Sequence, residues 1–341
     1  MKAAVIGSTT WGTTLAIVLA RKGFPVALWT RTAAEATTLE QYRESPSLPG
    51  TPFPSTLSVT DSLPDAVSRA DLVVLAIPSQ RMRQNISLVA LHMKGAPILL
   101  SLAKGLETGT GLRMSQVMAS ELPVRLHPHI AALSGPNLAR EIVRALPAAT
   151  VVASVKPETA ERAREMLSTP QLYVYASADV AGVELGGALK NVIAIAAGMV
   201  EELGYGDNAK AALMTRGLAE MMALGAACGA SQDTFLGLSG MGDLVVTCAS
   251  PLSRNHRVGI ELARGRSLEE VQADMREVAE GVYTTSAVRE LARRQGVSTP
   301  IAEQLYRVLF EGAEPRQAAH ELLWKQGPVR MSVQPPVHLE E

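Results

Sequence analysis

The sequence predicts an α/β domain built on a parallel sheet, followed by an all-helical domain. The chain has 341 residues, which suggests two domains at roughly 150 residues per domain. Short apolar runs alternate with helical patterns up to about Ala176, and long Ala-, Leu- and Met-rich periodic segments follow. We therefore expect an α/β domain over residues 1–176, a helical domain over 177–325 and a loose, Pro-rich tail over 326–341.

The strands of the first domain are expected where short runs are rich in β-branched and other apolar residues. These runs are Lys2–Ile6, Pro25–Trp29, Leu72–Ile77, Ile98–Leu102, Ile130–Leu133 and Thr150–Ser154. Helical patterns follow them, the first two over Thr13–Lys22 and Ala33–Arg43. Nearly continuous apolar strands that alternate with helices are typical of a parallel sheet covered on both faces.

In the second half, strand-like alternation disappears and helical periodicity replaces it. The expected helices are Val183–Val200, Ala209–Cys228, Leu268–Met275, Tyr283–Gln295 and Ile301–Phe310. Three segments that read as turns or loops separate some of them, namely Gly204–Asn208, Gly237–Asp243 and Ser250–Asn255. The pattern predicts a helical bundle.

Composition argues against several classes of protein. Lys and Arg total 32 against 33 for Asp and Glu, a formal net charge of -1, whereas proteins that coat nucleic acid carry a basic excess. The two cysteines, Cys228 and Cys248, cannot form a disulfide framework. Since the chain also opens directly into a strand, without a signal-like segment, we expect a cytoplasmic protein.

Membrane and metal sites are also not expected. The longest apolar stretch, Val183–Val200, is interrupted by Glu184, Lys190 and Asn191, and a lysine near the middle of a membrane span costs several kcal/mol. The six histidines show no metal-ligand spacing. The sequence therefore predicts neither a membrane span nor a bound metal.

The turn after the first strand resembles a phosphate-binding turn. It reads Gly7-Ser8-Thr9-Thr10-Trp11-Gly12, and a Rossmann-like dinucleotide-binding domain has G-x-G-x-x-G here, with the pyrophosphate at the helix N-terminus. Gly7 and Gly12 match, but Thr9 takes the middle position. Its hydroxyl either bonds the phosphate or its side chain obstructs the site. In the second case Thr9→Gly tightens NADPH binding by about 1 kcal/mol. A plain strand–turn–helix without a ligand stays an alternative.

The end of the second strand favours NADPH over NADH. It reads Trp29-Thr30-Arg31-Thr32, and no acid follows until Glu35. NAD-binding domains place an acid about 20 residues beyond the glycines to hold the ribose 2′-hydroxyl. A guanidinium with two hydroxyls suits a 2′-phosphate better, unless Arg31 is merely solvated.

Lys190 stands out because it lies inside an apolar helical segment. Leu189, Val192 and Ile193 surround it, so its ammonium group is expected in the interior or in a cleft. Burial lowers the pKa of a lysine and makes proton exchange possible near neutral pH. Asn191 beside it needs a partner if it is buried. The alternative is a lysine that reaches the surface from an apolar stem.

Two further segments are suited to small ligands. Residues 238–244 form a glycine-dense turn that presents one carboxylate, Asp243. Ser253, Arg254 and Asn255 concentrate hydroxyl, guanidinium and amide donors, a set that suits a phosphate because Arg binds it bidentately. Either segment alone is equally consistent with a solvated loop.

Together these segments resemble the bacterial NAD(P)-dependent glycerol-3-phosphate dehydrogenase family. The motifs run in order over residues 2–311. They comprise the GSTTWGT turn, Pro78-Ser79-Gln80, Lys104-Gly105-Leu106-Glu107, the segment from Ser134 to Glu141 (SGPNLARE), Gly186 to Asn191 (GGALKN), Thr215-Arg216-Gly217, Gly240 to Leu244 (GMGDL), Ser253-Arg254-Asn255 and Val278 to Gly281 (VAEG). Each motif is weak alone, but their joint order and spacing are specific.

The resemblance implies reversible reduction of dihydroxyacetone phosphate to sn-glycerol 3-phosphate, a precursor of phospholipids. It implies Lys190 as the proton-exchanging group, Lys104 in contact with substrate and coenzyme, and Asp243 as a positioning group. The implied substrate-binding residues are Lys104, Gly135, Asn137, Lys190, Asn191, Asp243, Ser253, Arg254 and Asn255. The implied coenzyme-binding residues are Gly7, Thr9, Thr10, Trp11, Gly12, Arg31, Lys104, Ala139, Arg254, Val278 and Glu280.

The resemblance also implies a helical domain similar to the C-terminal domain of 6-phosphogluconate dehydrogenase, and a homodimer. Two departures from the family pattern, Thr9 and the segment Arg43–Ser47, lie on the coenzyme side. Two other functions remain alternatives. One is a non-catalytic protein that senses NADP(H) or a metabolite, and the other is a two-domain hydroxyacid dehydrogenase with an unphosphorylated substrate.

Overall fold

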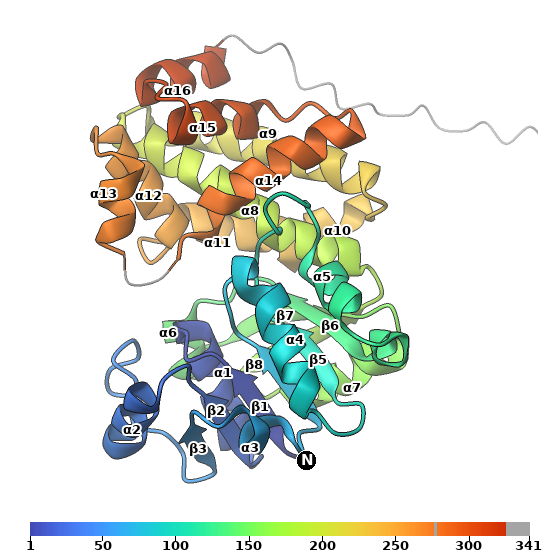
Figure 1. Cartoon of the computed structure of the whole chain (residues 1–341). Coiled ribbons are helices and arrows are strands. Elements are labelled where there is room, and N and C mark those ends of the chain that lie inside the picture. The colour runs from blue at the N-terminus through green and yellow to red at the C-terminus, as the bar shows by residue number, and fades with distance from the viewer. Residues whose placement is uncertain (276–277, 325–341) are drawn as a thin grey trace, which may run out of the picture.

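The computed structural model describes residues 1–275 and 278–324, so the tail predicted over 326–341 lies outside the described residues. The elements form two parts (Figure 1). The first half of the chain forms a sheet with helices on its faces, and the helices of the second half pack together above it. This is the predicted fold class, an α/β domain followed by an all-helical domain.

One eight-stranded sheet forms the α/β part, in the order β3-β2-β1-β4-β5-β6-β7-β8. Its strands are β1 (Ala3–Ile6), β2 (Val26–Trp29), β3 (Leu57–Thr60), β4 (Leu72–Leu75), β5 (Ile98–Ser101), β6 (Ile130–Ser134), β7 (Ala148–Ala153) and β8 (Leu172–Ser177). All neighbouring strands are parallel except β6 and β7. The fully parallel sheet that the sequence predicts is therefore wrong at this pair, where residues 135–147 lead the chain back beside β6 in the opposite direction.

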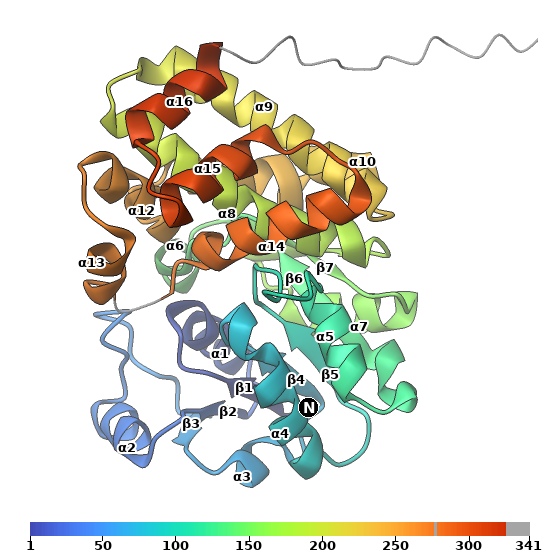
Figure 2. The same cartoon turned by 45° about the horizontal axis from the view of Figure 1, so that its top comes forward.

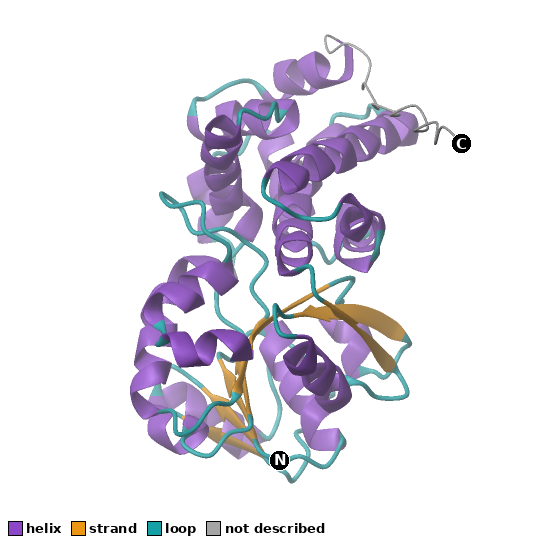
Figure 3. Ribbon diagram, turned by 90° about the vertical axis from the view of Figure 1, so that its right-hand side faces the viewer, coloured by secondary structure: helices purple, strands orange, loops and turns teal. Residues whose placement is uncertain are grey.

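Helices cover both faces of the sheet. They are α1 (Thr10–Arg21), α2 (Ala33–Tyr42), α3 (Leu63–Val67), α4 (Met82–His92), α5 (Met114–Glu121), α6 (Ala139–Val143) and α7 (Pro157–Leu167). Successive residues of β1 point to opposite faces, so Val5 packs in the core with α1 and α7, and Ile6 in the core with α3, α4 and α5. Figure 3 shows the twisted strands in orange between the helices. Both faces are buried, which explains the nearly continuous apolar strands.

The helical part surrounds one central helix, α8 (Val180–Glu202), which is buried over almost its whole length. Around it lie α9 (Gly206–Ala227), α10 (Gln232–Leu236), α11 (Asp243–Ala249), α12 (Arg254–Ala263), α13 (Leu268–Ala273), α14 (Glu280–Gln295), α15 (Pro300–Phe310) and α16 (Pro315–Trp324). By length and composition α8 is a candidate membrane span, but its apolar window is wholly buried. It is the core helix of this part.

Several predicted loops are helical in the structure. The turn expected at Gly204–Asn208 ends early because α9 begins at Gly206. The segment Gly237–Asp243 contains a π-helical turn, η3 (Leu238–Gly242), which leads directly into α11. The loop expected at Ser250–Asn255 ends at Ser253, the N-cap of α12. Strands β3 and β8 were not among the expected ones, because the alternation of β8 between buried Leu172 and exposed Tyr173 differs from the apolar pattern of central strands.

Candidate active site

The candidate site lies where the carboxyl ends of the central strands meet the helical part. Gly7 follows β1, Ser79 follows β4, Lys104 follows β5 and Gly135 follows β6. These four strands are parallel, so the four segments lie at one edge of the sheet, the edge at which open α/β sheets bind ligands. Helices α8 and α14 lie above this edge (Figure 2).

At its centre, Asp243 joins two lysines from different parts of the fold. Lys190 Nζ of α8 donates to Asp243 Oδ1 at 3.0 Å, and Lys104 Nζ donates to Asp243 Oδ2 at 2.6 Å. Lys190 also donates to Thr247 Oγ1 at 2.6 Å, and Lys104 to the carbonyl oxygen of Gly135 at 2.7 Å. The structure thus brings together the three residues that the sequence predicts as catalytic.

These groups are buried, and burial sets their charge. Lys190 is 5% exposed and Asp243 is 1% exposed. Burial, opposed by Asp243 and reinforced by nearby Lys104, lowers the pKa of Lys190 to about 8. Although burial alone would raise it, the two lysines hold the pKa of Asp243 below its usual range. A pKa of about 8 allows Lys190 to gain or lose a proton near neutral pH, beside a carboxylate that stays ionised.

Glycines allow α8 to approach the sheet closely enough to form this centre. A Cβ at Gly187 would lie 2.4 Å from Ser134 Oγ, at the end of β6, and one at Gly186 would lie 2.5 Å from the carbonyl oxygen of Ser239. A larger residue at either position would push the helix away. The two glycines therefore place Lys190, about one turn further along α8, over the carboxyl ends of the strands.

Asn191 and Asn255 link the elements around the lysines. Asn191 Nδ2 donates to the carbonyl oxygen of Lys104 at 2.8 Å, and Asn255 Nδ2 donates to Asn191 Oδ1 at 2.9 Å. Asn255 Oδ1 accepts from the backbone N–H of Gly281 at 2.9 Å. This chain connects the loop after β5 with α8, α12 and α14. It gives buried Asn191 the partner that we expected. Both polar atoms of the Asn255 side chain are hydrogen-bonded to the protein itself.

The other residues expected at the substrate phosphate lie at the N-terminus of α12 and after the end of β6. Ser253 caps α12, and its Oγ accepts from the backbone N–H of His256 at 3.2 Å. Arg254, at the surface, donates to the carbonyl oxygen of Val278 at 3.0 Å. Near the end of β6, Asn137 Nδ2 donates to Thr150 Oγ1 at 3.1 Å, and Asn137 Oδ1 is buried without a partner.

The glycine turn packs tightly against the strand β4. Gly7 has a φ of +107°, and a Cβ there would lie 2.5 Å from the carbonyl oxygen of Ala76. A Cβ at Gly12 would lie 2.5 Å from the Ala76 Cβ. Thr9 donates from its hydroxyl to the same Ala76 carbonyl at 3.2 Å and accepts from the N–H of Gly12 at 3.1 Å. The hydroxyl of Thr9 thus caps α1 and binds the protein.

The remaining coenzyme-side residues line the same end of α1. Thr10 begins α1, and α6, which begins at Ala139, packs against α1. Trp11 is half-buried, and its Nε1 is a buried donor without a partner. Arg31 is exposed just beyond β2. A glycine turn held close to the sheet, a helix N-terminus and an unpaired N–H donor fit a dinucleotide.

Glu280 joins the helical part to the coenzyme-binding edge. It lies at the start of α14, and its carboxylate accepts hydrogen bonds from the backbone N–H of Ser79, at 2.9 Å, and from the Ser79 hydroxyl. Burial raises the pKa of Glu280 above its usual range. A Cβ at Gly105 would lie 2.7 Å from Glu280 Oε2, so the glycine after Lys104 makes room for this contact.

Two functional contacts were missed at the sequence level. Thr247 binds Lys190, and it lies four residues after Asp243, one helical turn along α11. Ser79 binds Glu280, and it belongs to the Pro78-Ser79-Gln80 motif, which was quoted without a role. The i, i+4 spacing of Thr247 was the available signal, but it depends on a helix in a segment that the glycines make look like a loop.

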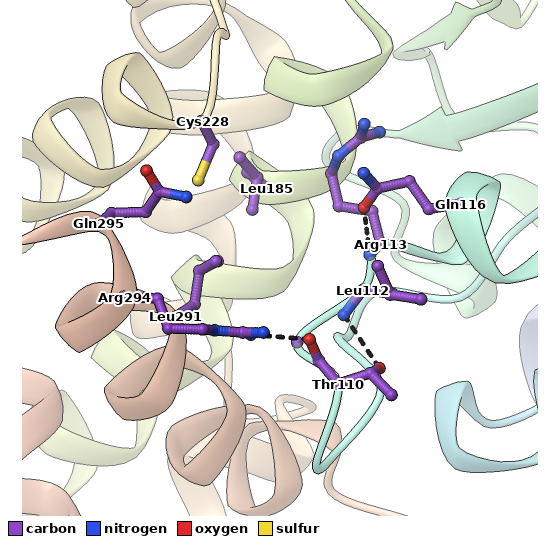
Figure 4. A pocket seen from close by; sticks show the side chains of 10 residues that line it. Thr110, Leu112, Arg113, Gln116, Leu185, Cys228, Leu291, Arg294 and Gln295 are labelled. Carbon is purple, nitrogen blue, oxygen red and sulfur yellow. Dashed lines mark hydrogen bonds between the residues drawn. The ribbon is translucent and has the colours of Figure 1, made fainter.

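A cavity of about 230 Å³ lies beside this site, at the contact between the two parts of the fold. Figure 4 shows it between the loop that carries Thr110 and Arg113, the helix with Leu185, and the end of α14 with Arg294. Arg294 donates to the carbonyl oxygen of Thr110 at 2.7 Å. Neither Lys190 nor Asp243 lines this cavity, so it is distinct from the lysine pair.

The fold and the site define the class: a two-domain dehydrogenase whose dinucleotide-binding sheet faces a helical domain that carries a buried lysine. Comparisons with known proteins give the family. Residues 2–160 match the model of the NAD-dependent glycerol-3-phosphate dehydrogenase N-terminus, and residues 179–320 match that of its C-terminus. The chain belongs to the NAD-dependent glycerol-3-phosphate dehydrogenase family.

Individual relatives agree with this assignment. A glycerol-3-phosphate dehydrogenase [NAD(P)+] of Dehalococcoides mccartyi is 50% identical over 327 residues, covering 95% of this chain and 91% of the relative. The crystal structure of glycerol-3-phosphate dehydrogenase from Coxiella burnetii superposes with a TM-score of 0.90 at 36% identity, covering 95% of this chain and 98% of that one. A D-mandelate dehydrogenase is 14% identical, covers 94% of this chain and 99% of that one with a TM-score of 0.64, and shares the fold alone.

Proposed function

We propose that this chain interconverts dihydroxyacetone phosphate and sn-glycerol 3-phosphate with NADPH as the preferred coenzyme. The observation that carries the proposal is the buried Lys190–Asp243–Lys104 centre at the dinucleotide-binding edge of the sheet. Reduction of a ketone needs a hydride donor, an acid for the developing alkoxide and groups that orient the substrate. When bound, the nicotinamide coenzyme supplies the hydride.

In this proposal, Lys190 is the acid. Its ammonium group, with a pKa of about 8, gives a proton to the ketone oxygen during reduction, and the neutral amine takes it back during oxidation. Asp243 and Thr247 fix the ammonium by hydrogen bonds of 3.0 Å and 2.6 Å. Lys104 adds a second positive charge beside the reacting oxygen, which stabilises the developing alkoxide in a site of low dielectric constant.

The phosphate of the substrate is assigned to the N-terminus of α12 and the end of β6. Arg254 supplies the guanidinium, and Ser253 and Asn255 lie on either side of it in the chain. Asn137 and the backbone at Gly135 complete the assignment. Asn255 acts from within a hydrogen-bond chain, whereas Arg254 is exposed. Asn255 is thus a positioning residue, and Arg254 is the main charged contact.

The preference for NADPH depends on Arg31. Its guanidinium is exposed beyond β2 and lies where a 2′-phosphate is expected. The two neighbouring hydroxyls contribute less than the sequence suggested, because Thr30 is fully buried and donates to the carbonyl oxygen of Thr32 at 3.1 Å. The hydroxyl of Thr32 caps α2 by accepting from the N–H of Glu35.

The test is oxidation of NADPH by purified full-length protein in the presence of dihydroxyacetone phosphate, followed by absorbance. We expect turnover with both coenzymes and a higher kcat/KM with NADPH. A folded protein that binds NADPH and does not oxidise it at saturating substrate contradicts the proposal. The homodimer and the cytoplasmic, phospholipid-related role stay family-based proposals, and light scattering after size-exclusion chromatography measures the former.

A further inference from the structure

Glu35 contacts the glycine turn, although it does not lie at the end of β2, where dinucleotide-binding folds usually place an acid. Glu35 lies in the first turn of α2, beyond the end of β2, and its Oε1 accepts a hydrogen bond from the hydroxyl of Ser8. Ser8 is the second residue of the glycine turn. Both side chains are half-buried. The carboxylate of Glu35 is therefore one hydrogen bond away from the turn that carries the coenzyme phosphates.

The local sequence predicts another role for Glu35, as the glutamate of a capping box at α2, and the structure does not contain that box. Thr32-Ala33-Ala34-Glu35 matches the capping-box pattern, in which the glutamate returns to the backbone N–H of the N-cap. Thr32 does accept from the N–H of Glu35, at 3.3 Å. Ser267 and Glu270 form the complete box at α13, but at α2 the carboxylate turns to Ser8 instead.

We propose that the Ser8–Glu35 pair is a specificity element for the adenosine ribose of the coenzyme, with Glu35 accepting a ribose hydroxyl. This proposal rests on the proposed function only in requiring that the chain binds a nicotinamide dinucleotide. Ser8 is the positioning residue, because it holds the carboxylate against the turn. Arg31, four residues earlier, is exposed just beyond β2 and carries the opposite charge.

The two charged groups act on the two coenzymes in opposite directions. A ribose 2′-hydroxyl donates to a carboxylate, which favours NADH. A 2′-phosphate carries negative charge, so Arg31 attracts it and Glu35 repels it. The chain thus holds one determinant for each coenzyme, and Glu35 limits the preference for NADPH that Arg31 provides.

The experiment compares binding of NADH and NADPH to wild type and Glu35→Gln by isothermal titration calorimetry, without substrate. Glutamine keeps the shape and an acceptor for Ser8 but removes the charge. We expect NADPH to bind roughly fivefold tighter, because a like charge is removed, and NADH to bind roughly threefold weaker, because a charge-assisted hydrogen bond is lost. Adenosine 2′,5′-bisphosphate and 5′-AMP repeat the comparison with the adenosine end alone.

Two controls separate this role from others. Glu158→Gln removes a carboxylate from the first turn of α7, and it should leave both affinities unchanged. Ser8→Ala should shift the ratio of the two affinities in the same direction as Glu35→Gln, since it releases the carboxylate. Equal changes for NADH and NADPH in folded Glu35→Gln, or no change in either, overturn the proposal. These binding results are independent of turnover, so a protein without dehydrogenase activity would contradict the proposed function and leave this test intact.

Discussion

The proposed substrate side and the proposed coenzyme side of the site are built in different ways. On the substrate side, Lys190 and Asp243 are buried, and every charged group has a partner from another element. On the coenzyme side, Ser8 and Thr9 are half-buried and Arg31 is exposed. Both departures from the family pattern also lie there. The contrast teaches that the core holds the proposed reacting charges in place, whereas the contacts proposed to select the coenzyme lie at or near the surface.

The buried centre is held together by ion pairs and hydrogen bonds. One carboxylate between two ammonium groups is costly to bury unless all three are paired, and removing one partner leaves an uncompensated charge. Hydrogen bonds to Thr247 and to the Gly135 carbonyl take a second of the three N–H donors of each ammonium group. In the proposed reaction these paired groups are already in place for the substrate oxygen, which is the condition for electrostatic stabilisation of a transition state.

The largest effect is expected from Lys190→Met. Methionine fills a similar volume, and Asp243 keeps its contact with Lys104 at 2.6 Å, so the fold should survive. Loss of a general acid lowers kcat by about 10²- to 10⁴-fold. Stopped-flow or steady-state oxidation of NADPH measures this. Lys156→Met at the exposed N-cap of α7 is the matched control, and activity of Lys190→Met near the wild-type value contradicts the catalytic role.

Arg254→Ala should have the next largest effect, on KM rather than kcat. A charged hydrogen bond to a phosphate contributes about 1.5–3 kcal/mol, so KM for dihydroxyacetone phosphate should rise about 10- to 100-fold. The same change should leave kcat/KM for unphosphorylated dihydroxyacetone nearly unaltered. Arg254→Lys keeps the charge and should recover part of the loss. An equal loss with both ketones would instead point to the contact of Arg254 with the Val278 carbonyl.

The pH dependence of the reaction tests the coupling within the buried centre. Reduction needs protonated Lys190, whose pKa is about 8, so kcat/KM for reduction should fall above about pH 8 and that for oxidation should rise through the same range. Asp243 raises the pKa of Lys190 by its negative charge. Asp243→Asn should therefore move the fall to lower pH by roughly one unit. A fall at unchanged pH would show that Asp243 does not set the charge of Lys190.

The sequence predicted the two-part fold and the main charged residues because these depend on local patterns. Short apolar runs indicate the strands of the sheet, and a lysine among the apolar residues of α8 is recognisable from its neighbours in the sequence alone. The glycines also indicated close approaches, and Gly187 against Ser134 is one. The three residues that the family resemblance implies as catalytic, Lys104, Lys190 and Asp243, do meet in the structure.

Other features could not be predicted, because they depend on how distant elements meet. The antiparallel pairing of β6 with β7 leaves no local pattern in either strand. The N-cap role of Ser253 depends on α12 beginning at Arg254, within a segment whose polar residues favour a loop. The contact of Glu35 with Ser8 joins residues 27 positions apart, and from the sequence the same glutamate completes a capping box.

The smallest effect is expected at Thr9, where the two hydrogen bonds of the hydroxyl decide which variant to test. Thr9→Gly would remove an obstruction and also the cap on Gly12 and the contact with the Ala76 carbonyl. The first change favours NADPH binding and the second destabilises the turn, so the two effects on affinity oppose each other.

Thr9→Ser removes only the γ-methyl group and keeps both hydrogen bonds. If the methyl group obstructs the coenzyme, NADPH should bind about two- to threefold tighter to Thr9→Ser, the scale of a small strained contact. Calorimetric titration with NADPH measures this, and Thr38→Ser, at an exposed position of α2, is the matched removal of a methyl group. Unchanged or weaker binding to Thr9→Ser would show that the turn accommodates the threonine fully and that the departure from glycine costs the coenzyme nothing.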